Sequence, residues 1–288
     1  MHRRNFLLAG FSALAAAAAR AQSSPATLRI GLTPVFLDDQ VAFLNAWRDY
    51  LVTRLGRPVK FVQRGSYREI VEALRKRELE FAWICGLPYV QNAADLRLVA
   101  VPLFNRRPYY QSYLIVPSAD QTSRSILDLR GKVFAFSDPD SNSGHLYPTW
   151  LLGTFNDRPE AFFARTFFTW AHRSVVEAVA RALADGGAVD SYVWETLAKL
   201  QPQLTGRTRV IHRSPEFGHT PFVANAAVAR GDFEGFREVL LHMSGDAEGR
   251  GLLARLNLDG FATATPKLYE GIARMMIAVR KSGNAAAS

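Results

Sequence analysis

Cysteine is nearly absent from this chain of 288 residues, which has a single one, Cys85. One cysteine cannot form an internal disulfide, so a packed apolar core must stabilise the fold. Metal-binding motifs are missing too, because the six histidines are scattered and no His-Glu-x-x-His sequence occurs. The sequence therefore predicts neither a metal site nor a cofactor.

Signatures of catalysis are equally scarce. The chain contains no Gly-x-Ser-x-Gly nucleophile elbow. Ser143, His172 and Asp190 could supply a nucleophile, a base and an orienting carboxylate, but nothing in the sequence establishes their geometry. We therefore predict that the protein is not an enzyme.

Long apolar runs are missing except near the N-terminus. Residues 6–18 form an apolar run after a basic start, and residues 19–21 have the small-x-small form of a cleavage site. A membrane-spanning helix needs roughly 20 apolar residues, which this run does not reach. We expect residues 1–21 to be a signal peptide cleaved near Ala21, and the mature protein to be exported without stable membrane insertion. Arg3-Arg4 also fits the twin-arginine pattern, so two export routes stay open.

No block of like charges occurs. The formal charge is +9, and removal of Arg3, Arg4 and Arg20 with the signal peptide lowers it to +6. The remaining basic residues are spread along the chain, which argues against a nucleic-acid partner. A mild positive field would instead help to collect small anions.

Alternating strand and helix patterns fill the first part of the mature chain. Predicted strands cover residues 28–32, 59–62 and 81–85, and predicted helices cover 41–55 and 67–76. A second unit follows, with strands at 133–136, 164–170 and 187–189 and helices at 144–155 and 174–184, the latter capped by Ser174. Such alternation predicts parallel sheets covered by helices.

Two apolar runs, at 109–117 and 209–228, are predicted to connect these units. We expect an α/β protein of two lobes, each a mostly parallel sheet flanked by helices, joined by two crossing hinge strands. The predicted first lobe comprises residues 27–113 and 223–288, and the second comprises 114–222. Ligands bind beyond the carboxyl ends of such strands, so the lobes should enclose a cleft. The loops expected to line it are 65–67, 85–89, 141–145, 170–174, 190–192 and 215–221.

The segment Asp138–His145 lies between a predicted strand and a predicted helix. Ser141, Asn142 and Ser143 are helix-capping types, and Gly144 allows close approach of the backbone. A helix that begins in this way directs free N–H groups, hydroxyls and its positive dipole end toward one point. The turn could be an ordinary helix cap, or it could bind a small oxyanion.

The sequence resembles the periplasmic phosphonate-, phosphite- or phosphate-binding proteins of ABC transporters, which have the type II periplasmic binding protein fold. The resemblance rests on the Asp138–Gly144 motif and on residues 187–193 and 209–215, in consistent order along the mature chain. It implies a periplasmic, monomeric protein that delivers a small oxyanion to a transporter permease. It also implies ligand contacts from Ser141, Asn142, Ser143, Gly144, Tyr67, His172, Tyr110 (or Tyr109) and Asp190.

Departures from the family pattern bear on the ligand. The family members that take aminoalkyl phosphonates have a carboxylate in an Asp-Pro step, where this chain has Thr220-Pro221, preceded by Gly218-His219. We therefore expect phosphite, phosphate or a short alkylphosphonate, with Tyr89 and Thr220 as additional ligand contacts.

Cys85 leaves open an alternative function to transport. A lone cysteine is usually a small buried hydrophobe. Placed at the cleft, however, it could contact the ligand or bind thiophilic arsenite, as in related sensor proteins that dock on a membrane histidine kinase. Two interpretations of Asp190 stay open as well. Its carboxylate could contact the ligand, or it could simply close a turn.

Overall fold

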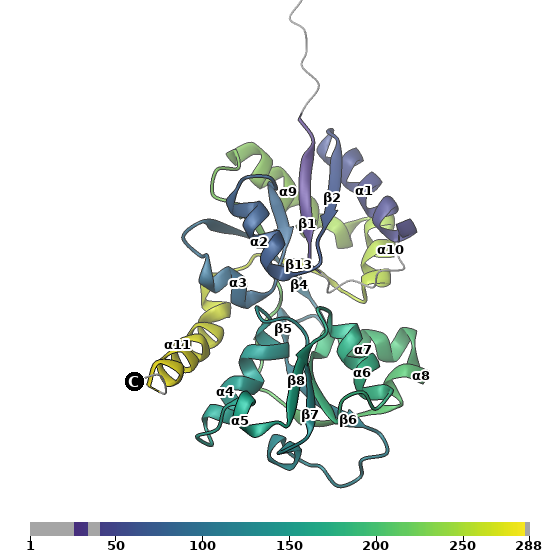
Figure 1. Ribbon diagram of the computed structural model, residues 1–288. Helices are drawn as coiled ribbons and strands as arrows, with labels where there is room; N and C mark the ends of the chain where they lie inside the picture. The colour runs from purple at the N-terminus through teal and green to yellow at the C-terminus, as the bar shows by residue number, and fades with distance from the viewer. Residues whose placement is uncertain (1–25, 34–40, 286–288) are drawn as a thin grey trace, which may run out of the picture.

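The computed structural model describes residues 26–33 and 41–285, so the predicted signal peptide lies outside the described residues. Figure 1 shows two lobes, one above the other, each with a β-sheet and helices around it. The predicted fold class, a two-lobed α/β protein, is confirmed.

The first sheet has six strands. They are β1 (Leu28–Leu32), β2 (Val59–Gln63), β3 (Phe81–Trp83), β4 (Leu96–Leu103), β12 (Phe222–Asn225) and β13 (Gly260–Ala262). Their order is β13-β4-β12-β3-β1-β2. β1 runs parallel to both β2 and β3, as the alternating pattern predicts, whereas β12 runs antiparallel to β3 and β4.

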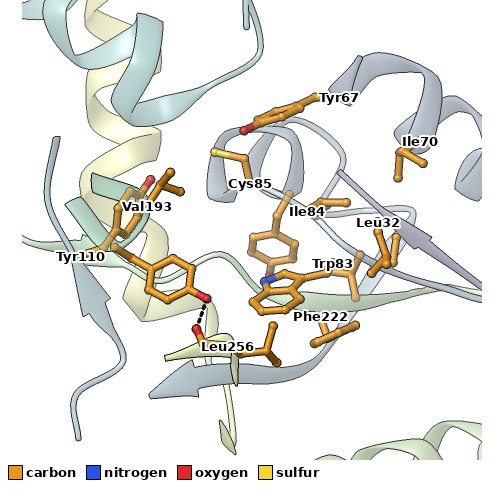
Figure 2. Close-up of a cluster of buried hydrophobic side chains, with 14 of the residues drawn as sticks. Leu32, Tyr67, Ile70, Trp83, Ile84, Cys85, Tyr110, Val193, Phe222 and Leu256 are labelled. Carbon is orange, nitrogen blue, oxygen red and sulfur yellow. Dashed lines mark hydrogen bonds between the residues drawn. The ribbon is translucent and has the colours of Figure 1, made fainter. Parts of the chain in front are cut away.

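Helices cover this sheet and complete its core. They are α1 (Val41–Leu55), α2 (Tyr67–Arg75), α3 (Gly86–Gln91), α9 (Arg230–His242), α10 (Ala247–Leu256) and the short 3₁₀ turns η3 (Met243–Gly245) and η4 (Pro266–Tyr269). Trp83 packs on Phe222 with ring centroids 5.0 Å apart, beside Leu32 and Ile84 (Figure 2). The indole of Trp83 therefore anchors the end of β3 that leads into Cys85.

The second sheet has five strands. They are β6 (Ser112–Pro117), β7 (Val133–Phe136), β8 (Arg165–Phe168), β9 (Gly186–Asp190) and β10 (Thr208–Arg213), in the order β10-β6-β9-β7-β8. Its helical segments are η1 (Ile126–Leu129), η2 (Asn142–Leu146), α4 (Tyr147–Gly153), α5 (Pro159–Phe162), α6 (His172–Ala180), α7 (Ser191–Leu200) and α8 (Pro202–Thr205). β7 is parallel to both β8 and β9, so their carboxyl ends share one edge.

Two short strands carry the chain between the sheets. β5 (Tyr109–Tyr110) leaves the first sheet after β4, and β11 (Phe217–Gly218) returns from β10 to β12. They pair with each other in antiparallel register. The C-terminal helix α11 (Glu270–Ala285) contacts α3 beside the first sheet and α4 beside the second (Figure 1). No helix in the described part of the chain has the length and apolar character that a membrane span requires.

The helix predicted over 144–155 is in fact two segments. In the wide π-type turn η2, the Tyr147 N–H bonds to the Asn142 carbonyl, and α4 then starts with Pro148 in its first turn. Proline has no N–H to give to Gly144, whose carbonyl instead accepts the N–H of Ser137 at 3.3 Å. The chain therefore widens at the turn before it continues as an α-helix.

Other boundaries also differ from the prediction. Ser174 does not cap α6, which begins at His172 after an extended Ala171. Most of the loop expected at residues 85–89 belongs to α3, and β4 was not predicted at all. Both elements are held by packing with distant segments, which local sequence signals do not report.

Candidate functional site

The Ser141–Gly144 turn lies at the carboxyl end of β7 and is fully buried. Ser141 caps η2, with its Oγ accepting the N–H of Gly144 at 3.0 Å. The Ser143 Oγ and the Asn142 Oδ1 are buried without a hydrogen-bond partner among the described residues. A Cβ on Gly144 would lie 1.8 Å from the Ser137 Oγ, so only glycine fits here. The turn thus keeps unused polar atoms inside the protein, which is costly unless a ligand binds them.

His172 and Asp190 meet beside this turn. His172 is the first residue of α6, and its Nδ1 lies 3.1 Å from the backbone N–H of Asp190, which donates to it. The ring proton therefore resides on Nε2, which lies 3.4 Å from the Ser141 Oγ. Burial lowers the pKa of His172 to about 3, so the imidazole is a neutral N–H donor.

Asp190 ends β9 and caps α7. Its Oδ1 accepts the N–H groups of Tyr192 at 2.8 Å and Val193 at 3.4 Å, which confirms a capping role. Burial nevertheless raises the pKa of Asp190 to about 7, because the desolvation of the carboxylate outweighs these hydrogen bonds. The residue is 1% exposed, so its carboxyl group is shielded from solvent.

Tyr67 brings α2 to the same place from the first lobe. Its backbone N–H donates to the Asp138 Oδ2 at 3.1 Å, which links α2 to the segment after β7. Its side chain is 1% exposed, and its hydroxyl lies beside the Cys85 thiol in Figure 2. Burial raises the pKa of Tyr67, with smaller contributions from Cys85 and Asp190, so its hydroxyl stays protonated as a donor.

Cys85 and Tyr110 contact the turn directly. The N–H of Asn142 donates to the Cys85 Sγ at 3.3 Å, and the Asn142 Nδ2 donates to the Tyr110 hydroxyl at 2.9 Å. Burial raises the pKa of the Cys85 thiol to about 11, so the thiol is protonated at neutral pH. Tyr110 also lies near the Ser143 hydroxyl, although the two make no hydrogen bond of normal geometry.

The two other predicted contacts, Tyr89 and Thr220, have their recognisable partners in the first lobe. Tyr89 packs edge-on against Tyr269, with ring centroids 5.0 Å apart, and no hydrogen bond to the turn is recorded for it within the described residues. Thr220 is buried, and its Oγ1 and carbonyl oxygen accept the Trp83 indole N–H at 2.9 Å each. These contacts tie Thr220 to the core of the first lobe.

His219 is a buried residue that the sequence did not single out as a ligand contact. Its ring centroid lies 5.6 Å from that of Tyr110 and 5.1 Å from that of Tyr192, and its Nε2 has no partner among the described residues. The departure at Gly218-His219 from the family pattern was the only sequence signal for this position.

The buried site carries no permanent positive charge. Within residues 26–33 and 41–285, no lysine or arginine is among the buried side chains, and no His, Cys, Asp or Glu cluster could hold a metal ion. Arg68 pairs with Asp140 at 3.3 Å, but it does so at the exposed rim. An anion here would be held by hydroxyls, N–H groups and helix dipoles, which suits selection by oxygen geometry and protonation state.

The chain matches known proteins over most of its length. The family model for the periplasmic substrate-binding protein of phosphonate ABC transporters matches residues 30–269. The phosphate-import protein PhnD of Mycolicibacterium smegmatis is 27% identical over 224 residues, covering 72% of this chain and 69% of the relative. A probable ABC transporter phosphite-binding protein of Prochlorococcus marinus is 24% identical, covering 87% of this chain and 89% of the relative.

Solved structures share the fold. A binding-protein component of an ABC phosphonate transporter from Pseudomonas aeruginosa has a TM-score of 0.83 and 21% identity, covering 90% of this chain and 88% of that one. The Prochlorococcus marinus protein in complex with methylphosphonate has a TM-score of 0.80 and 21% identity, covering 88% of this chain and 98% of that one. The family match confirms the resemblance drawn from the sequence and the prediction that the protein is not an enzyme.

Proposed function

Because the chain belongs to the family of periplasmic substrate-binding proteins of phosphonate ABC transporters, we propose that it captures a small phosphorus oxyanion in the site around the Ser141–Gly144 turn. The ligands are phosphite, phosphate or a short alkylphosphonate. The observation that carries this proposal is the pair of unpartnered polar groups, on Asn142 and Ser143, buried where a helical segment begins. Burying them without a ligand costs about 1–3 kcal/mol each.

The turn would bind the oxyanion through hydroxyl and amide groups. The oxygen and nitrogen of an asparagine amide are assigned from their partners. Rotation of the Asn142 amide by half a turn would let the Tyr110 hydroxyl donate to Oδ1 and would present Nδ2–H to the ligand. The Ser143 hydroxyl and the positive end of the helical segment add further attraction for an anion.

Groups from α6, α2 and the end of β9 would complete the shell. His172 offers its Nε2–H, since Nδ1 is occupied by the Asp190 N–H. Tyr67 offers a hydroxyl that burial keeps protonated. We assign to Asp190 a proton shared with the ligand, because a carboxylate with a pKa of about 7 can either donate to a P–O⁻ oxygen or accept from a P–OH group.

The partner we propose is the permease of an ABC importer, on which the closed protein would dock as a monomer. We also propose that the mature chain begins after Ala21, which mass spectrometry of the exported protein would test. The alternative sensor function of Cys85 has no support from the relatives named above. Its thiol is protonated at neutral pH and is the only one in the chain, which does not favour a strong arsenite site.

Isothermal titration calorimetry tests the proposed function. Phosphite, phosphate and methylphosphonate should bind with 1:1 stoichiometry, whereas sulfate and arsenite should bind weakly or not at all. Failure of all three phosphorus ligands to bind would contradict the proposal, and tight arsenite binding lost in Cys85→Ser would favour the sensor.

The Ser143→Ala variant tests the turn itself. A hydrogen bond to a charged ligand contributes about 1.5–3 kcal/mol, so we expect affinity to fall about 10- to 100-fold. The free protein should lose no stability, because the hydroxyl has no partner.

Ser125→Ala is the matched control. Ser125 caps η1 in a capping box with Asp128, so its loss should lower stability by about 1 kcal/mol and leave ligand affinity unchanged. Unaltered affinity in Ser143→Ala would contradict the assignment of the turn.

A further inference from the structure

His219 is held in a defined position inside the protein. It lies between β11 and β12. Its backbone N–H donates to the Pro108 carbonyl at 2.8 Å, and its backbone carbonyl accepts the Tyr269 hydroxyl at 3.0 Å. The preceding Gly218 approaches Leu268 so closely that a Cβ would lie 2.7 Å from its carbonyl oxygen. The backbone on both sides of the imidazole is therefore fixed.

The neighbours of His219 determine which ring nitrogen carries the proton. The Thr220 Oγ1 lies 3.0 Å from the His219 Nδ1 and also accepts the Trp83 indole N–H, which can only donate. If the Thr220 Oγ1 also accepted a proton from Nδ1, its own hydrogen would have no acceptor among the described residues, which is unfavourable for a buried hydroxyl. Thr220 therefore donates to Nδ1, and the ring proton resides on Nε2.

The His219 Nε2 is a buried donor with nothing to bind. The residue is fully buried, and burial lowers its pKa to about 3, so the ring is neutral at physiological pH. Its neighbours Tyr110 and Tyr192 both belong to the candidate site, since Tyr110 contacts Asn142 and the Tyr192 N–H bonds to Asp190. An unpartnered N–H beside these groups needs an acceptor from the ligand.

We propose that His219 is a specificity-determining ligand contact, whose Nε2–H donates to the phosphorus substituent opposite the Ser141–Gly144 turn and so selects phosphate over phosphite and methylphosphonate. The inference rests on the proposed function and narrows the proposed ligands to phosphate. Phosphate offers an oxygen acceptor in every direction, whereas phosphite presents a P–H bond and methylphosphonate a methyl group at one position. Sites that donate to a ligand discriminate strongly against analogues without the acceptor, because the buried donor is then left unpaired.

The same arrangement disfavours aminoalkyl phosphonates. An ammonium group needs an acceptor, whereas His219 presents an N–H donor and the Thr220 hydroxyl is already bonded to Trp83 and His219. Thr220 thus stands where the family's aminophosphonate binders have a carboxylate, without a free acceptor of its own.

Calorimetry with the three phosphorus ligands tests the inference. The wild-type protein should prefer phosphate by about tenfold or more. His219→Phe keeps a ring of similar shape but removes the N–H, so phosphate affinity should fall about tenfold while methylphosphonate affinity changes little. His219→Gln restores an N–H donor and should recover part of the preference. His242→Phe, at the exposed end of α9, is the matched control and should alter neither value.

The outcomes separate this inference from the proposed function. If none of the ligands binds the wild-type protein, both fail. If all three bind with equal affinity, or if His219→Phe weakens all three equally, only the role of His219 is overturned. Should His219→Phe fail to fold, Thr220→Val tests the assignment. Without the Thr220 hydroxyl, nothing keeps the His219 ring proton on Nε2, so the phosphate preference should decrease. A phosphate preference unchanged in Thr220→Val would then overturn the assignment.

Discussion

Asp190 is the residue at which the candidate site is most sensitive to pH. Its carboxyl group is buried and caps α7, its backbone N–H donates to His172, and burial raises its pKa from 3.8 to about 7. The folded protein therefore holds a proton that the unfolded chain has released between about pH 4 and pH 7. In that window the contribution of Asp190 to the free energy of unfolding decreases as pH rises.

Replacement of Asp190 by asparagine isolates this effect. Asparagine can still accept the N–H groups of Tyr192 and Val193, but it stays neutral. The free energy of unfolding of Asp190→Asn minus that of the wild type should increase with pH from 4 to 7, by at most about 1.4 kcal/mol per unit. Chemical denaturation of both proteins at several pH values, without ligand, measures this difference in the free energy of unfolding. Parallel stability curves would show that Asp190 has an ordinary pKa.

Among the elements, η2 contributes most to the candidate site. Its wide turn places Ser141, Asn142 and Ser143 at the end of β7, and it depends on close approach of the backbone to Ser137. The same contact explains why a glycine is needed at position 144, since its missing Cβ makes room for the Ser137 side chain and for the His172 ring.

A single methyl group should therefore disrupt this element. In Gly144→Ala the new Cβ would lie 1.8 Å from the Ser137 Oγ and 3.1 Å from the His172 Cε1. We expect a loss of about 1–3 kcal/mol in the free energy of unfolding, together with loss of phosphate binding. Gly153→Ala at the end of α4 is the control, because nothing lies within 4 Å of its Cβ position, and it should be neutral or slightly stabilising. Equal stability of the two variants in thermal denaturation would contradict the close approach.

On the scale of the whole molecule, polar contacts link the two lobes. Near α10, the Asn257 Nδ2 donates to the Thr196 Oγ1 at 3.0 Å, and the Tyr192 hydroxyl donates to the Leu256 carbonyl. A dashed line marks this hydrogen bond at Leu256 in Figure 2. Arg68 and Asp140 form a second link beside α2. Small polar contacts of this kind can shift the balance between open and closed forms without contacting the ligand.

Asn257→Gly should shift that balance toward the open form. Asn257 has a φ of 55°, which glycine adopts readily, so the backbone is kept while the side-chain links to Thr196 and Lys199 are lost. We expect ligand affinity to fall about fivefold or less, with faster ligand dissociation in stopped-flow experiments and a larger radius of gyration in small-angle scattering. Asn156→Gly is the matched control, since this exposed residue has a φ of 60° and should change neither quantity. A dissociation rate that matches in the two variants would exclude a role for Asn257 in closure.

Much of the fold could be predicted from local patterns. The first strand and the first helix have the predicted bounds, and α2 begins at Tyr67 as predicted, where the Ser66 hydroxyl accepts the Glu69 N–H. β4 escaped prediction because its place between β12 and β13 comes from pairing with residues more than a hundred positions away. The predicted lobe boundaries and ligand contacts remain predictions.

The sequence by itself determined the two-lobed α/β class and the Ser141–Gly144 turn, because capping residues, glycine and apolar periodicity act over a few neighbouring positions. Its resemblance to known proteins indicated the family. Only the tertiary structure decided which polar groups are buried without partners, which nitrogen of His172 carries the proton, and that His219 lies beside Tyr110. These properties depend on desolvation and on contacts between distant segments, such as Trp83 with Thr220 and Asp190 with His172. Neither the desolvation of a side chain nor its contacts with distant segments can be derived from the order of residues along the chain.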